Sequence, residues 1–283
     1  MLQMNKGAPL TIGDGVKGAE APALSVEDSL CGKLLPFVLS VAAGSMDIIG
    51  FLRLGGLFTA HVTGNVVVLA AKLVAREEAP VAYLISVPVF VAVLALTTLL
   101  AKGLAQRQIP TLLPLLLLQF LLLSAFFAIS FAAGERIDPN TARMIFAGML
   151  GVSAMAVQNA LVRLSLTGAP STAVMTTNIT TFSVDAMEML LGHDTARAER
   201  ARDRARRTWP VIVGFLLGCA LGAACETAFA LPSLALPAGL ALLALALGAA
   251  ASSPHGDRQL TLLDYRRNEN GERKLPGRTS AEP

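Results

Sequence analysis

Apolar residues lie along this chain in long blocks separated by short polar stretches, rather than alternating with polar residues. A bilayer's hydrocarbon core is crossed by about 20 helical residues, and blocks of this length recur throughout the chain. The pattern predicts an all-α, polytopic helical membrane protein. The eight apolar segments cover residues 34–54, 57–75, 81–101, 112–133, 142–164, 172–191, 209–231 and 234–251.

Polar stretches divide and bound these segments. Residues 1–33 and 254–283 carry scattered charges and are predicted to be polar tails. A polar gap after the fourth segment separates a first membrane half, residues 34–133, from a second half, residues 142–251. Each half therefore contains four apolar segments.

The second and sixth segments differ from the others because each concentrates polar residues at what would be bilayer depth. Either all eight segments span, or six span fully and these two are irregular. Lysine and arginine gather in cytoplasmic loops. Eight spans would place the loop with Lys102 and Arg107 outside, whereas six spans place it inside, so charge favours six. Both counts place both tails in the cytoplasm.

Six arginines between residues 193 and 207 form the most basic loop of the membrane region. Such a loop determines topology by staying cytoplasmic. Basic loops of this kind also bind anionic lipid headgroups. We assign the first role to this loop.

An internal repeat is the next feature of the pattern. Residues 59–64 resemble residues 176–181, with an offset of 117 residues between Thr63 and Thr180. Each hexapeptide lies in the second segment of its half, after a helix with a polar insertion. Duplicated halves are a common architecture of secondary transporters, whose sites lie at the repeat interface on broken helices. Close packing of small residues in membrane helices is the alternative explanation.

Composition narrows the class of protein further. Apolar residues make up 54% of the chain, charged residues 15%, and the net charge is +3. These values exclude a disordered chain, a disulfide mini-protein and a nucleic-acid binder with a basic face. Three cysteines and three histidines occur, without zinc, metalloprotease, serine-hydrolase or phosphate-loop motifs. We therefore expect no enzyme activity, no metal site and no cofactor.

The first half supplies the leading candidate site residues. An ionised Asp47 at bilayer depth would cost about 2.5–3.5 kcal/mol, so it should face protein or a watery cavity. It is a candidate proton- or cation-binding group, or a structural partner of Thr63, Gly64 and Asn65. His61 and Asn65 are four residues apart and would share one helical face. His61 could relay a proton or cap the segment, and a break at Thr63–Gly64 would free carbonyls for an ion.

The second half offers counterparts. Gln158 and Asn159 provide amide groups for a polar solute or for an interhelical hydrogen bond. Asn178 and Asp185 are seven residues apart and are predicted to share one helical face. Thr177 and Thr180 complete the predicted polar lining, which we expect to face residues 59–65.

Short motifs surround these polar positions. In the first half they are Ala43-Gly44-Ser45-Met46-Asp47, Gly50-Phe51, Phe58-Thr59 and Thr63-Gly64-Asn65; in the second half they are Gly151, Gln158-Asn159, Arg163 and Thr176-Thr177. Together they resemble the paired signatures of the YoaK-type family of bacterial membrane proteins, over roughly residues 34–250. The chain departs from that pattern at Asn178 and at Thr181, where the family usually has a bulkier residue and a glycine. The resemblance implies a polytopic inner-membrane protein, often taken for a transporter, without an established substrate.

The pattern and the resemblance lead to one functional prediction. The chain is expected to be a transporter or permease that moves a small solute across the inner membrane, with proton coupling through Asp47 and a site between the halves. Its expected partners are the lipid bilayer and that solute. The alternative is a membrane scaffold or accessory subunit in which the polar motifs only join helices.

Overall fold

The computed structural model describes residues 30–77, 81–134, 138–191 and 194–252, so most of both predicted tails lies outside the described residues. Within these ranges the fold is all-α, as predicted. The elements are α1 Leu30–Arg53, α2 Val62–Ala75, α3 Val81–Gln106, α4 Leu112–Ala132, α5 Ala142–Ser165, α6 Met175–Leu191, α7 Thr195–Phe229, the 3-10 helix η1 Leu231–Leu234, and α8 Ala235–Ala251.

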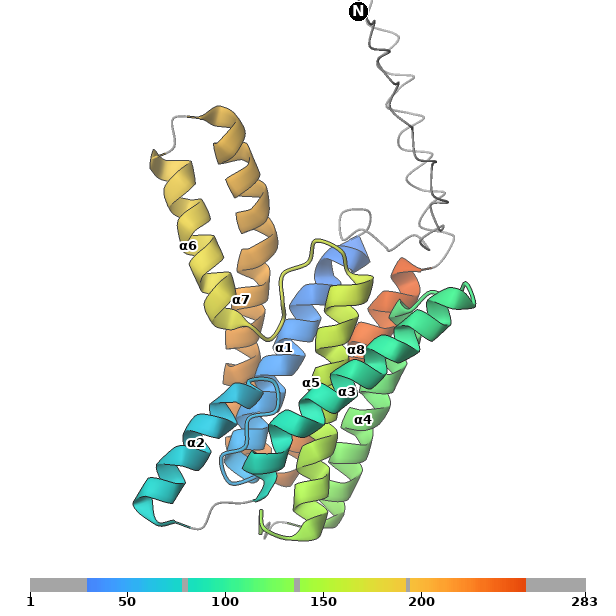
Figure 1. Ribbon diagram of the computed structural model, residues 1–283, viewed down its shortest axis with the longest axis vertical. Helices are drawn as coiled ribbons and strands as arrows, with labels where there is room; N and C mark the ends of the chain where they lie inside the picture. The colour runs from blue at the N-terminus through green and yellow to red at the C-terminus, as the bar shows by residue number, and fades with distance from the viewer. Residues whose placement is uncertain (1–29, 78–80, 135–137, 192–193, 253–283) are drawn as a thin grey trace, which may run out of the picture.

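Six helices of the described chain are long and apolar enough to cross a membrane: α1, α3, α4, α5, α7 and the η1–α8 unit. The other two, α2 and α6, have only 14 and 17 residues. Figure 1 shows both beginning near mid-height of the bundle, α2 running toward one end and α6 toward the other. This arrangement corresponds to the count of six spans with two irregular segments.

The arginine-rich segment is helical, and its prediction as a loop was wrong. α7 extends over 35 residues and includes all six of these arginines. The Asp194 carboxylate caps the helix by accepting hydrogen bonds from the N–H groups of Ala196 and Arg197, at 2.9 and 3.3 Å. Alanine, arginine and glutamate then favour the helix over the following turns. α7 is therefore about 52 Å long, which exceeds the thickness of a hydrocarbon core.

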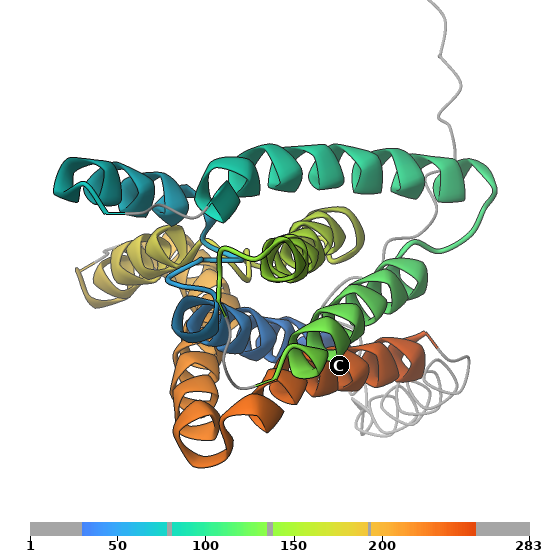
Figure 2. The ribbon, with the colours of Figure 1, turned by 90° about the horizontal axis from the view of Figure 1, so that it is seen from below.

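α1 and α5 form the interior of the bundle. α1 packs against α7 and α8, whereas α5 packs against α3 and α4. Figure 2 shows α3 beyond α5 on one side, with α7 and α8 beyond α1 on the other. Figure 1 shows that α1 and α5 run in opposite directions. The first helix of each half thus packs against the third and fourth helices of the other half.

A stripe of glycines allows α1 and α7 to approach closely. Gly214, Gly218 and Gly222 recur every fourth residue along the face of α7 that contacts α1. A Cβ at Gly218 would overlap the backbone carbonyl of Val41, so no larger side chain fits there. Small residues at this spacing are the usual means of close helix packing in membranes.

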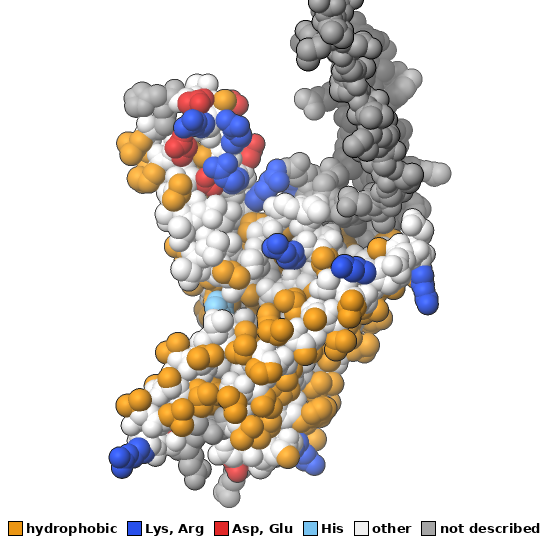
Figure 3. Space-filling model, in the orientation of Figure 1, with side chains coloured by type: hydrophobic (Ala, Val, Ile, Leu, Met, Phe, Trp, Pro, Cys, Tyr) orange, Lys and Arg blue, Asp and Glu red, His pale blue; other side chains and the backbone are white. Residues whose placement is uncertain are grey.

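The surface has the polarity that a bilayer requires. Large apolar side chains are exposed on α2, α3, α4, α6 and α7. Figure 3 shows them as a broad apolar area over the bundle, with a cluster of basic side chains at the end where α6 meets α7. The fold is that of a polytopic helical membrane protein.

Candidate functional site

The chain is not helical between α1 and α2, and this break lies earlier in the sequence than the predicted one. Residues 54–61 form a loop in which Gly55 and Gly56 have φ values of +69° and +98°, a backbone conformation that favours glycine. The hydroxyl of Tyr83, from α3, donates to the Gly55 carbonyl. α2 begins at Val62, so Thr63 and Gly64 lie inside a helix. The prediction of a break at Thr63–Gly64 was therefore wrong.

The carboxylate of Asp47, on α1, forms hydrogen bonds to this loop. Its Oδ1 accepts hydrogen bonds from the Thr59 N–H at 2.8 Å, the Ala60 N–H at 2.6 Å and the Thr59 hydroxyl at 3.2 Å. The residue is 4% exposed. The carboxylate thus satisfies backbone donors just before α2, at the end where the helix dipole favours negative charge. Asp47 thus has a structural role, through Thr59 and Ala60 rather than through the predicted Thr63, Gly64 and Asn65, and its proton- or cation-binding role stays a prediction.

His61 engages the other carboxylate oxygen. Its Nδ1 lies 2.5 Å from Asp47 Oδ2. The imidazole also packs edge-on against Phe215 of α7, with ring centroids 5.1 Å apart. The side chain of His61 is 34% exposed, whereas that of Asp47 is 5% exposed. The histidine therefore lies between the buried carboxylate and the surface of the protein.

A cavity of about 430 Å³ opens at this pair. It is mainly apolar, and its polar atoms come from Asp47, His61 and the thiol of Cys219. Three phenylalanines from α1, from the loop before α2 and from α7 form much of its wall. The lining residues are Asp47, Ile48, Phe51, Phe58, His61, Phe215 and Cys219.

Asn65 fixes the loop from the opposite side and does not line the cavity. Its amide pairs with the Phe58 backbone, accepting from the N–H at 2.8 Å and donating to the carbonyl at 2.8 Å. It also donates to the Ser86 hydroxyl on α3 at 3.0 Å. Asn65 is fully buried within α2, whereas His61 precedes the helix with a non-helical backbone, so the predicted common helical face does not form. A side chain at Gly64 would be crowded, because its Cβ would lie 3.0 Å from the Phe58 ring. The Thr63 side chain is exposed.

The loop before α6 repeats part of this bonding. Asn178 donates to the Ser171 carbonyl, seven residues earlier, at 2.6 Å, as Asn65 does to Phe58. Thr172, equivalent to Thr59, bonds to a polar side chain of the preceding span, Gln158, at 2.8 Å. These contacts align residues 58–65 with 171–178 at an offset of 113, rather than the 117 of the sequence comparison.

Gln158 serves as an interhelical hydrogen-bonding group. It is fully buried, donates to the Leu39 carbonyl at 2.9 Å and accepts from Gln119 of α4 at 2.6 Å. Asn159 donates to the Met155 carbonyl of its own helix at 2.8 Å. Of the two predicted roles for these amides, the contacts of Gln158 correspond to joining helices, whereas the described bond of Asn159 lies within α5.

The remaining second-half candidates do not converge on the cavity. Thr177 and Thr180 are exposed, and the Thr180 hydroxyl donates to the Thr176 carbonyl. Asn178 and Asp185 are both buried on α6, which confirms their common face. Asp185 binds the Arg204 guanidinium of α7, with Oδ1 2.5 Å from Nη2, and so ties the α6–α7 pair together.

Several site residues were missed in the sequence. The cavity phenylalanines and Cys219 gave no signal, because apolar residues are ordinary in membrane helices. Gln119 could have been found as a lone amide within an otherwise apolar segment. Arg53 and Glu226 form an ion pair of 2.5 Å between α1 and α7. Among the described residues no three histidine, cysteine, aspartate or glutamate side chains cluster as a metal site.

Comparison with known proteins gives one match. The family model described as "Protein of unknown function (DUF1275)" matches residues 35–247, which include both loops and all six spans. No curated protein matches the chain, and no solved structure does. With three quarters of its length matched, this chain belongs to the DUF1275 family, an uncharacterised family consistent with the YoaK-type resemblance of its motifs.

Proposed function

We propose that this protein transports a small solute across the membrane and couples that movement to a proton at the Asp47–His61 pair. One observation supports the proposal above others. A buried carboxylate at the start of a half-length helix contacts an imidazole that opens onto a cavity of about 430 Å³. Intramembrane ionisable residues of this kind mark ion and proton pathways.

The two carboxylate oxygens of Asp47 have different tasks in this mechanism. Oδ1 already accepts three hydrogen bonds from the loop, so it holds α2 in place. Oδ2 contacts Nδ1 of His61, and a proton can be shared or exchanged along that contact. An imidazole can act as both a proton donor and a proton acceptor, which suits a group that passes on a coupling proton. A solute in the cavity would meet His61 before Asp47, because His61 is the more exposed.

The cavity also indicates what kind of solute fits. Its three phenyl rings favour an apolar body, and its single acid–imidazole pair favours one polar or cationic group. We therefore propose a small amphipathic solute rather than a highly charged one.

The arrangement of the halves supports transport as well. We propose that α1–α4 and α5–α8 are inverted repeats: α1 and α5 run in opposite directions, each packs against the third and fourth helices of the other half, and both halves contain a half-length helix. Inverted repeats with broken helices are typical of secondary transporters. The arginines of α7 and the α3–α4 connection lie at one end, which we propose is cytoplasmic.

Proton-coupled uptake in proteoliposomes tests the proposal. A thermal-shift screen of amino acids, organic amines, polyols and nucleobases selects the solute, and a trapped pH dye then reports proton movement when that solute is added. We expect Asp47→Asn and His61→Gln to abolish the dye response. Asp185→Asn is the matched control, because it changes a buried carboxylate that binds Arg204 away from the cavity. Solute-driven proton movement that persists in folded Asp47→Asn protein would overturn the coupling role.

The native Cys219 thiol tests whether the cavity holds water. In a variant that keeps only this cysteine, we expect a charged methanethiosulfonate reagent to label Cys219 but not a cysteine placed at lipid-facing Leu216, which is 62% exposed on the same helix. Labelling by a membrane-permeant maleimide alone would show a dry cavity. That result would favour the scaffold role, in which the polar motifs only join helices.

A further inference from the structure

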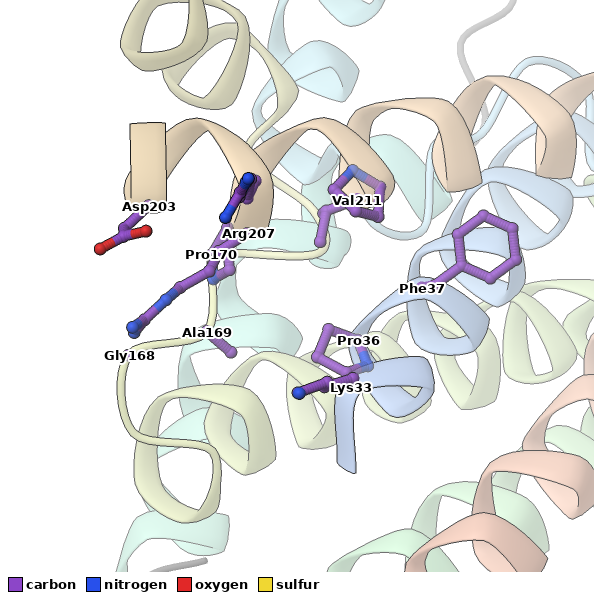
Figure 4. A pocket seen from close by; sticks show the side chains of 11 residues that line it. Lys33, Pro36, Phe37, Gly168, Ala169, Pro170, Asp203, Arg207 and Val211 are labelled. Atoms are coloured by element: carbon purple, nitrogen blue, oxygen red, sulfur yellow. The ribbon is translucent and has the colours of Figure 1, made fainter. Parts of the chain in front are cut away.

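A second cavity lies at the end of the bundle where α1 begins and α5 ends. Its volume is about 440 Å³. Figure 4 shows side chains from the start of α1 on one side, side chains from α7 on another, and residues 168–170 of the α5–α6 connection between them. None of its lining residues belongs to the Asp47–His61 cavity, so it is a separate site.

The charges around this cavity favour an anion. Lys33, Arg206 and Arg207 line it together with one carboxylate, Asp203. The Arg207 side chain reaches across to the loop, where a Cβ on Gly168 would lie 3.3 Å from its Nη1. Ammonium and guanidinium groups offer several donors from different directions, which suits the acceptor oxygens of a phosphate group.

The depth of the cavity indicates that this phosphate belongs to a lipid. Trp209 lies two residues after Arg207 and is 49% exposed, as expected of an aromatic residue at the membrane–water interface. The same cavity continues over the apolar side chains of Pro36, Phe37 and Pro210. A basic rim above an apolar floor at headgroup depth matches the polar head and glycerol region of a phospholipid.

We propose that this cavity binds the phosphate of an anionic phospholipid headgroup. The site gives the basic part of α7 a specific ligand in addition to its role in orientation. The site joins α1 to α7 and to the loop before α6, and α1 and α7 also line the first cavity. A bound lipid would hold these three elements together at the proposed cytoplasmic end.

Binding of short-chain phosphatidylglycerol to the full-length protein in neutral detergent tests the proposal. We expect saturable binding that weakens about fivefold in Lys33→Gln or in Arg206→Gln, and about 25-fold in the double variant. Arg202→Gln is the matched control, because Arg202 is an exposed α7 arginine outside the cavity lining. Circular dichroism and gel filtration check that each variant is folded.

Three further results would overturn the proposal. Equal weakening by Arg202→Gln would show general attraction to a basic surface. Equal affinity for short-chain phosphatidylcholine would show that the site does not recognise net anionic charge. Inorganic phosphate that binds as tightly as phosphatidylglycerol would identify a site for free phosphate, not for a lipid.

Discussion

Replacement of Asp47 tests the contact that holds the loop before α2. The carboxylate is 4% exposed and accepts three hydrogen bonds through Oδ1, while Oδ2 faces His61. Alanine would leave two buried backbone N–H groups, the Thr59 hydroxyl and the imidazole without their acceptor. Each buried donor that loses its acceptor costs about 1–3 kcal/mol, so with two backbone N–H groups affected we expect Asp47→Ala to lower the free energy of unfolding by about 3–5 kcal/mol.

Asparagine should cost less, because its carbonyl oxygen can still accept from the N–H groups of Thr59 and Ala60. Each bond loses its charge assistance, and the amide nitrogen replaces the oxygen that faces His61. We expect a loss of about 1–2 kcal/mol for Asp47→Asn. Thr59→Val removes only the 3.2 Å hydroxyl bond and should cost about 1 kcal/mol or less.

Equilibrium unfolding in mixed detergent micelles titrated with dodecyl sulfate, followed by circular dichroism, measures all three variants. The expected order of destabilisation is Asp47→Ala, then Asp47→Asn, then Thr59→Val. If the free energy of unfolding of Asp47→Ala lies within about 0.5 kcal/mol of that of the parent protein, as for an ordinary surface substitution, the carboxylate does not stabilise the loop before α2. The same outcome would leave the buried acid available for coupling alone.

Two further pairs of substitutions compare matched positions by the same unfolding assay. Asn65→Leu should destabilise the protein by about 2–4 kcal/mol and Asn178→Leu by about 1 kcal/mol, because the first amide makes three described hydrogen bonds and the second makes one. Equal losses would contradict the difference between the two loops. Gly218→Ala should cost about 1–3 kcal/mol through overlap with the Val41 carbonyl, whereas Gly239→Ala, with nothing within 4 Å of its Cβ, should be neutral or slightly stabilising. A tolerated Gly218→Ala would show that α1 and α7 separate freely.

The spans were predictable because hydropathy acts locally. Within lipid each backbone polar group must be bonded inside its own segment, so a long apolar block becomes a helix wherever it is placed. The predicted boundaries of α3, α4 and α5 accordingly lie within a few residues of the observed ones. The exception was the amino-terminal part of α7, where charge was taken as a sign of a loop although its residues favour a helix.

The polar residues were predictable in identity but not in partnership. Asp47 and Asn65 were recognised as unusual at bilayer depth, yet the backbone groups they bind lie 7–13 residues away in a loop whose path depends on α1 and α3. The repeat register shows the same limit. The match of residue letters favoured an offset of 117 residues, whereas the equivalent hydrogen bonds align Asn178 with Asn65 in sequence, at an offset of 113.

The sequence by itself therefore determined that this is a polytopic helical membrane protein and which few polar side chains are costly to bury. Only the tertiary structure decided that Asp47 meets His61 beside a cavity, that Gln158 joins helices, and that Lys33 and Arg206 line one cavity. The physical reason is the distance along the chain over which each effect acts. Burial in lipid constrains each segment separately, whereas a site forms only where side chains from distant segments are brought within a few ångströms by packing.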